Sequence, residues 1–155
     1  IELLAPAGNL EMAAEVTRAG ANAIYVGPRG WSRRRDTFEM EDGAVREAIR
    51  LAHDGGAKLR VACNTHLQSK EIPALLSRIE RFVMDGVDGA IMADIGAIAA
   101  VLGAFPLPLH ASIGANILND ADVAFYREIG VCQVVADTKL TLRELLSRKA
   151  QLDVG

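Results

Sequence analysis

A dense group of cationic side chains follows one apolar segment of this chain. Arg29 and the run Arg33, Arg34 and Arg35 flank Trp31 within a short stretch. The planar guanidinium group forms paired hydrogen bonds with phosphate or carboxylate, and an indole ring can stack on a base. The group therefore predicts a site for an anionic substrate, an RNA backbone included. The alternative is that the cations are neutralised by three acidic residues that follow closely, Glu39, Glu41 and Asp42.

A second set of polar residues comes at the ends of later apolar segments. We predict catalytic roles for His110, Ser112 and Asp94, and substrate-binding roles for Asn64, Thr65, His66, Asn116 and Lys139. Several of these residues have a structural alternative. His110 could be a satisfied histidine of the core or rim, His66 could face solvent, Asp94 could cap a helix, and Ser112 and Asn116 could bind loop backbone.

The spacing of these residues does not assemble a known hydrolytic motif. Ser112 lies two residues from His110, so on a strand both side chains share one face and could touch one ligand without forming a triad. The sequence contains no His-Glu-x-x-His motif, and no metal site is predicted. Cys63 and Cys132 lack metal-type spacing and are expected to be small core residues in a reducing cytoplasm.

Alternating strands and helices would bring these residues together. We expect short apolar strands at 1–6, 23–27, 58–64, 89–94, 107–112 and 133–137. Helical patterns occupy 10–20, 43–55, 70–85, 95–103, 120–129 and 142–149, with caps at Asn9, Ser69 and Asn119 and a capping box of Thr141 with Glu144. This order predicts an α/β fold of (βα) repeats with parallel strands, whose carboxyl ends would surround one mouth.

Two architectures fit this alternation, an open doubly wound sheet and an incomplete TIM-type barrel with about six of eight units. No Gly-x-Gly-x-x-Gly follows a strand, and residues 152–154 resemble the start of a seventh strand. We therefore expect residues 1–155 to form a single domain that is a fragment of a longer barrel. Unpaired sheet edges would favour self-association of such a fragment.

Charge and hydropathy limit the kinds of partner and the cellular location that we expect for the protein. The net charge is −3 and the pI about 5.6, which argues against coating of nucleic acid but allows a local basic patch. No apolar run approaches the roughly 18 residues that span a bilayer, and no signal peptide is visible. A cytoplasmic location without a membrane span is expected.

Five stretches carry a family resemblance. They are ELLAPAGN at 2–9, GANAIYVG at 20–27, CNTHL at 63–67, DGAIMADIG at 88–96 and LHASIGANILN at 109–119. In this order they resemble the N-terminal part of the catalytic barrel domain of the collagenase-like peptidases, peptidase family U32. Matches to the family pattern include His110, Ser112, Asn116, Asn64, Thr65 and Asp94. Two pairs depart from it: Ile113–Gly114 replaces Thr-Gln, and Thr138–Lys139 replaces Arg-Glu.

The resemblance implies a barrel enzyme, named for proteolysis of collagen. Other members are associated with hydroxylation of tRNA, rRNA or the ubiquinone ring, often with a 4Fe-4S cluster whose cysteines lie mainly beyond the end of this chain. We therefore expect no cofactor in the chain itself. Our first hypothesis is a collagenase-like protease acting on peptides. Two alternatives remain open: an iron–sulfur-dependent hydroxylation factor for RNA or a ubiquinone precursor, and an anion- or RNA-binding module without catalysis.

Overall fold

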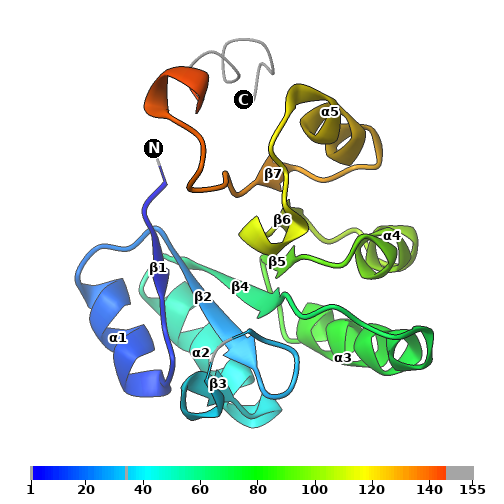
Figure 1. Cartoon of the computed structure of the whole chain (residues 1–155). Helices are drawn as coiled ribbons and strands as arrows, with labels where there is room; N and C mark the ends of the chain where they lie inside the picture. The colour runs from blue at the N-terminus through cyan, green and yellow to red at the C-terminus, as the bar shows by residue number, and fades with distance from the viewer. Residues whose placement is uncertain (1, 34, 146–155) are drawn as a thin grey trace.

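The computed structural model describes residues 2–33 and 35–145, in which strands and helices alternate as the sequence predicts (Figure 1). The main strands are β1 (Leu4–Pro6), β2 (Ala23–Pro28), β4 (Lys58–Cys63), β5 (Gly89–Met92), β6 (Leu109–Ala111) and β7 (Gln133–Val134). The helices are α1 (Leu10–Arg18), α2 (Asp42–Asp54), α3 (Ile72–Met84), α4 (Ile95–Ala104) and α5 (Asp120–Glu128). In this part of the chain, none of the helices has the length and apolar character needed to cross a membrane.

The main strands form one parallel sheet in chain order, β1-β2-β4-β5-β6-β7. Each new strand is added on the same side of the previous one, as successive right-handed crossovers require. Figure 1 shows the strands in an arc with α1 to α5 along its outer side. The fold is therefore α/β with six parallel strands that form a half-barrel. This confirms the predicted TIM-type architecture over the doubly wound alternative.

The hydrophobic core lies between the outer face of the sheet and the helices. Leu59 and Val61 of β4 belong to this core, whereas Arg60 between them does not. Because side chains alternate along a strand, Arg60 points to the inner face of the half-barrel. His110 of β6 faces inward for the same reason, since its two strand neighbours are core residues. The inner face therefore carries polar side chains that the apolar pattern of the strands conceals.

Most predicted helix starts are confirmed. Asn9 and Asn119 accept N–H groups of the first helical turn, and Thr141 with Glu144 forms the capping box. The prediction for Ser69 is wrong. A 3-10 turn, η2 (Ser69–Glu71), precedes α3, so Gln68 occupies the capping position and its N–H donates to Glu71 Oε2 at 2.7 Å.

The largest differences from prediction are at strand ends and in one loop. β6 and β7 are shorter than expected because the chain turns soon after each, into η3 (Ile113–Ala115) after β6. The sequence analysis missed η1 (Asp36–Phe38) and the two-residue strand β3 (Glu39–Met40), which pairs parallel with β2. The helix predicted at 142–149 is present over 142–145. Its remaining residues and the seventh strand predicted at 152–154 lie outside the described residues.

Candidate functional site

The predicted site residues follow the carboxyl ends of the strands, which share one rim of the half-barrel. We call this rim the mouth. After β2 come Arg29, Trp31 and Arg33; after β4 come Asn64, Thr65 and His66; Asp94 follows β5; His110 lies in β6, with Ser112 and Asn116 beyond it; and Lys139 follows β7. Arg34 lies outside the described residues. The parallel topology thus gathers the predicted segments at one rim, while their roles in binding or catalysis stay predictions.

The segment 29–33 and 35–38, which we call the arginine loop, contacts the segment that follows β4 through Trp31 and Arg33. The N–H of Arg33 donates to Asn64 Oδ1 at 2.9 Å, and Thr65 Oγ1 donates to the carbonyl of Trp31 at 3.3 Å. Trp31 is half-buried and packs against the core. Two groups that lie far apart in sequence are therefore joined by hydrogen bonds. Asn64 and Thr65 hold loop backbone, which the sequence did not predict.

The base of the arginine loop is fixed by two charged side chains. The Glu39 carboxylate accepts N–H groups from Gly30 at 2.9 Å and Ser32 at 3.3 Å. Arg78 of α3 donates from Nη1 to the carbonyl of Arg29 at 2.6 Å. A loop whose backbone groups are already bound loses less conformational freedom when it binds a ligand. The loop is therefore a preformed platform for its side chains.

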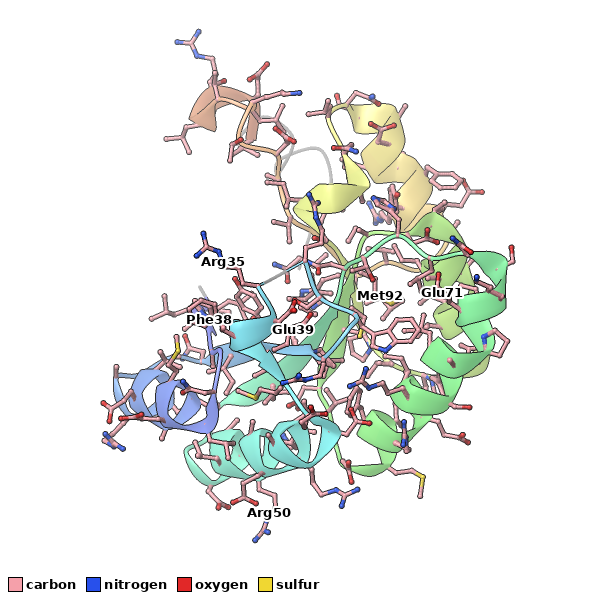
Figure 2. All side chains as sticks on the ribbon, turned by 60° about the horizontal axis from the view of Figure 1, so that its bottom comes forward. Arg35, Phe38, Glu39, Arg50, Glu71 and Met92 are labelled. Atoms are coloured by element: carbon pink, nitrogen blue, oxygen red, sulfur yellow. The ribbon has the colours of Figure 1, made fainter. Side chains whose placement is uncertain are left out.

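The acidic residues near the loop neutralise only part of its charge. Glu41 pairs with Arg29, with Nε 2.7 Å from the carboxylate, while Asp42 binds arginines of α3. Arg33 and Arg35 are exposed and form no ion pair with a carboxylate among residues 2–33 and 35–145. Figure 2 shows Arg35 extending away from the ribbon. The cation cluster is thus neutralised at Arg29, whereas Arg33 and Arg35 remain available to an anion.

Asp94 is the N-cap of α4. Its Oδ1 accepts the N–H of Ala97 at 2.9 Å, and its Oδ2 accepts the N–H of Leu67 at 3.2 Å. Partial burial alone would raise the pKa of Asp94, but these two donors and nearby His66, at 3.7 Å, hold that pKa below its ordinary value. The carboxylate therefore stays ionised and joins α4 to the segment after β4. His66 is exposed, as its alternative predicted.

His110 lies on the inner face, where it is only 4% exposed. Burial, together with the charge of Arg60, lowers the pKa of His110 to about 4, although Glu2 opposes this effect. The imidazole is consequently neutral near pH 7 and has a free lone pair for a proton. Its predicted catalytic role is compatible with this state, as is the alternative of a buried structural histidine.

Arg60 is the feature of this face that the sequence analysis missed. Its side chain is 7% exposed and its Nη2 lies 2.7 Å from Glu2 Oε1. Its Nε and Nη1 atoms have no hydrogen-bond partner among the described residues. An arginine inside the apolar strand sequence KLRVAC was the available signal, because a buried guanidinium needs a partner.

Ser112 is also buried, but its hydroxyl serves the turn that follows β6. Ser112 Oγ accepts the N–H of Gly114 at 3.4 Å, and its own N–H donates to the carbonyl of Met92 at 2.7 Å. Asn116 closes this turn in the left-handed conformation, with φ of 54°. Because the Asp94 carboxylate is directed to α4, the contacts in the described chain do not assemble a Ser-His-Asp triad.

The two cysteines do not fit an iron–sulfur cluster. Cys63 lies in the core, where burial raises its pKa to about 12. Cys132 is exposed as a residue, which corrects the prediction that it is a core residue, and its thiol donates to the carbonyl of Leu109 at 3.1 Å. Within the described ranges, no group of three or more His, Cys, Asp or Glu side chains could hold a metal ion.

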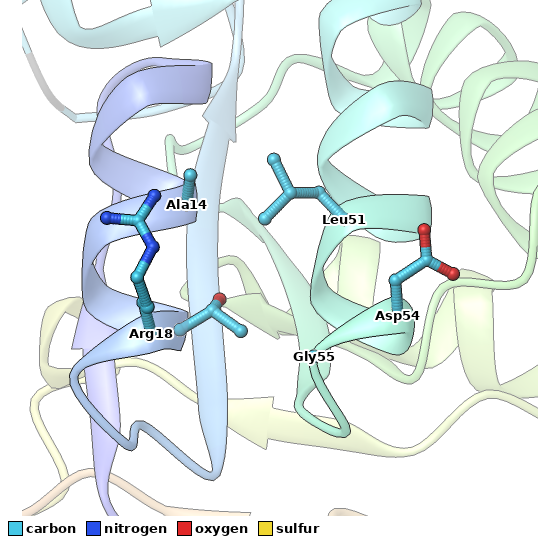
Figure 3. Close-up of a pocket in the computed structure, with 6 residues that line it drawn as sticks. Ala14, Arg18, Leu51, Asp54 and Gly55 are labelled. Atoms are coloured by element: carbon cyan, nitrogen blue, oxygen red, sulfur yellow. The ribbon is translucent and has the colours of Figure 1, made fainter.

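Two further features lie apart from these contacts. Lys139 is exposed in a turn after β7, where its N–H donates to Asp137 at 2.8 Å. A groove between α1 and α2 is lined by residues that include Thr17, Arg18 and Asp54 (Figure 3). These residues end their helices just before the next strand begins, so the groove lies at the rim opposite the mouth. It does not contribute to the candidate site.

Comparison with known proteins identifies the family. The chain matches Peptidase family U32 over residues 8–154. It is a member of peptidase family U32. The structure of the U32 peptidase Mk0906 superposes with a TM-score of 0.80 at 14% identity, covering 96% of this chain and 64% of that one. The family resemblance seen in the sequence is thereby confirmed, and the likeness of the two structures shows a shared fold.

Two relatives from Escherichia coli (strain K12) have names that refer to RNA. The tRNA hydroxylation protein P is 32% identical over 145 residues, which are 93% of this chain and 32% of the relative. The 23S rRNA 5-hydroxycytidine C2501 synthase is 32% identical over 146 residues, which are 94% of this chain and 22% of the relative. The chain thus spans at most about a third of the length of these two proteins.

Proposed function

We propose that this chain is part of an enzyme that hydroxylates tRNA or rRNA. The observation that carries the proposal is that two relatives at 32% identity, aligned over more than nine-tenths of the chain, are named for RNA hydroxylation. This favours the hydroxylation alternative over our first hypothesis of a collagenase-like protease. A tRNA or rRNA substrate also agrees with the expected cytoplasmic location.

The charge distribution at the mouth supports an RNA substrate. Arg33 and Arg35 are exposed on a loop whose backbone is fixed, and guanidinium groups bind phosphate in a defined orientation. The chain has a net charge of −3, so this local patch, rather than the whole surface, would contact the RNA backbone. We assign Arg33 and Arg35 to phosphate binding, with Trp31 beside them as a surface for stacking.

The inner face supplies groups for chemistry on a base that reaches it. His110 is neutral near pH 7 and could accept a proton, and Arg60 has two nitrogen donors for an oxygen acceptor. We assign Ser112 and Asp94 to holding the turn after β6 and the start of α4. The described residues do not fit an iron–sulfur cluster, so no step of the proposal is derived through one.

Peptide hydrolysis is the second candidate. It is favoured by the superposition on the U32 peptidase Mk0906 and by the burial of both His110, in β6, and Ser112, just beyond it. It lacks an activated nucleophile in the described contacts, because Ser112 Oγ accepts from Gly114. A third candidate, RNA binding without catalysis, would need only the arginine loop.

Mass spectrometry of nucleosides separates these functions. The protein that carries this chain is expressed in Escherichia coli strains that lack either named relative, and tRNA and 23S rRNA are digested to nucleosides. Reappearance of a nucleoside with one added oxygen atom supports hydroxylation, and its loss in the Arg33→Ala variant assigns the loop to the substrate. RNA binding without the added oxygen supports the binding module, while cleavage of a casein or gelatin substrate by the purified protein supports the peptidase.

A further inference from the structure

Two glycines at the mouth each lie under a side chain of the arginine loop. A Cβ atom added to Gly114, in η3, would lie 2.7 Å from Arg33 Nη1. A Cβ atom added to Gly8, just after β1, would lie 2.6 Å from Phe38 Cδ1. Real Cβ atoms essentially never approach another heavy atom this closely. A Cβ atom at position 8 would therefore have to displace Phe38 from its base, and one at position 114 would have to move the end of the Arg33 side chain.

Backbone conformation does not explain why these positions are glycine. Among the described residues, the glycines with positive φ are Gly20, Gly30, Gly56, Gly86 and Gly130, and neither Gly8 nor Gly114 is among them. A side chain at either position would be compatible with the backbone angles. The space above each position is occupied instead. Phe38 covers Gly8, with its Cβ atom 3.1 Å from the added Cβ, and Gly114 is covered by Arg33 and by the Cβ atom of Ala93 at 3.1 Å.

The two contacts place the arginine loop across the mouth from β1 to β6. Figure 2 shows Phe38 close to the start of α1, which follows Gly8. Between the two glycines, the N–H of Arg33 is bound by Asn64 after β4. At the far end, Gly114 donates its own N–H to Ser112 Oγ, so Arg33 lies over the turn that Ser112 holds.

We propose that Gly8 and Gly114 are positioning residues that seat the arginine loop on the mouth, with Gly114 leaving the space in which the Arg33 guanidinium lies over the turn held by Ser112. The inference rests on the proposed function, because it gives the Arg33 cation a defined place for a phosphate of the RNA. Each glycine acts through the loop side chain that covers it. Gly114 thereby links the loop that binds the backbone of the substrate to the strand that carries His110.

The test compares Gly114→Ala with Arg33→Ala and with the double variant, all in the full chain. Affinity for total tRNA is measured by filter binding. Arg33→Ala is expected to weaken it about tenfold, as for one charged hydrogen bond, and Gly114→Ala should weaken it measurably but by no more than Arg33→Ala does. The double variant is expected to bind no more weakly than Arg33→Ala alone. Gly43→Ala is the matched control, because its glycine has open space around the Cβ position and an ordinary φ.

Trypsin cleavage within the loop at Arg35 gives a second readout that does not depend on RNA. Gly114→Ala and Gly8→Ala should be cut faster than the wild type, and Gly43→Ala at the wild-type rate. Removing the covering side chain should relieve the clash, so Gly8→Ala with Phe38→Ala should melt at the temperature of Phe38→Ala alone. If Gly114→Ala lowers the melting temperature, Gly114→Ala with Arg33→Ala should likewise melt at the temperature of Arg33→Ala alone.

The outcomes distinguish the two proposals. Wild-type protein that binds no tRNA removes the proposed function, and the protease and melting comparisons then decide whether the glycines seat the loop. Additive losses of affinity in the double variant, or wild-type cleavage of both glycine variants, would overturn the positioning role. Equal acceleration of cleavage by Gly43→Ala would do the same.

Discussion

Replacing Asp94 with alanine tests whether this carboxylate supports the fold of the mouth. The change removes two hydrogen bonds, from Ala97 at 2.9 Å and from Leu67 at 3.2 Å. Loss of an N-cap costs about 1 kcal/mol, and loss of a second bond to a charged acceptor about 1.5 kcal/mol. We therefore expect Asp94→Ala to lower the free energy of unfolding by roughly 2–3 kcal/mol, or the melting temperature by about 5–10 °C.

Asp94→Asn should destabilise the fold less than Asp94→Ala does, because asparagine caps helices as well as aspartate does. Some loss should remain, since only one of the two terminal atoms of asparagine can accept a hydrogen bond. The pKa of Asp94 is below its ordinary value of 3.8 in the folded chain, so its carboxylate contributes stability above that pH and loses it as pH falls further. Urea unfolding at pH 7 and pH 3 should thus show a smaller difference between wild type and Asp94→Asn at pH 3. Asp54→Ala, at the exposed end of α2, is the control. Wild-type stability of Asp94→Ala would refute the assignment of Asp94 as a structural cap.

Three further outcomes follow from the inner face and the cysteines. The free energy of unfolding should fall as pH drops from about 6.5 to about 4, because the unfolded chain protonates His110 more readily than the folded chain does. In urea titrations, His110→Gln should remove this part of the dependence of stability on pH. An unchanged pH dependence would contradict the prediction. Arg60→Met should raise the pKa of His110 in an NMR titration, because the nearby charge of Arg60 lowers that pKa, and an unshifted titration would contradict the placement of the two side chains on one face. Cys132 should react with iodoacetamide at pH 8 before Cys63, as peptide mass mapping would show, and faster labelling of Cys63 would disprove its burial.

Strand and helix positions were predictable because apolar alternation and helix caps are local signals. The strand ends then placed Arg29, Asn64, Asp94 and His110 around the mouth, since parallel strands leave no other choice of side. The hydrogen bonds that these side chains form were harder to predict from the sequence. Whether Asp94 caps α4 or supplies a free carboxylate depends on the path of the segment after β4, which brings the N–H of Leu67 to it.

The contacts of the arginine loop lay beyond sequence reasoning for a different reason. Gly114 is far from Arg33 along the chain, and their contact depends on the route of a loop that contains η1 and is followed by β3. Arg60 was hidden because an apolar run was interpreted as one that is buried on both faces, whereas a barrel strand can carry charge on its inner face.

The salt dependence of tRNA affinity tests the RNA-binding mouth most directly. The logarithm of the association constant is plotted against the logarithm of the salt concentration for three proteins. These are the wild type, the loop variant Arg33→Ala with Arg35→Ala, and a control variant on the outer helices, Arg18→Ala with Arg50→Ala. Figure 2 shows Arg50 on α2, away from the loop. Removing two phosphate contacts should reduce the slope by about 1.4–1.8 in the loop variant and leave the control unchanged. An unchanged slope in the loop variant, or an equal reduction in the control, would contradict the account.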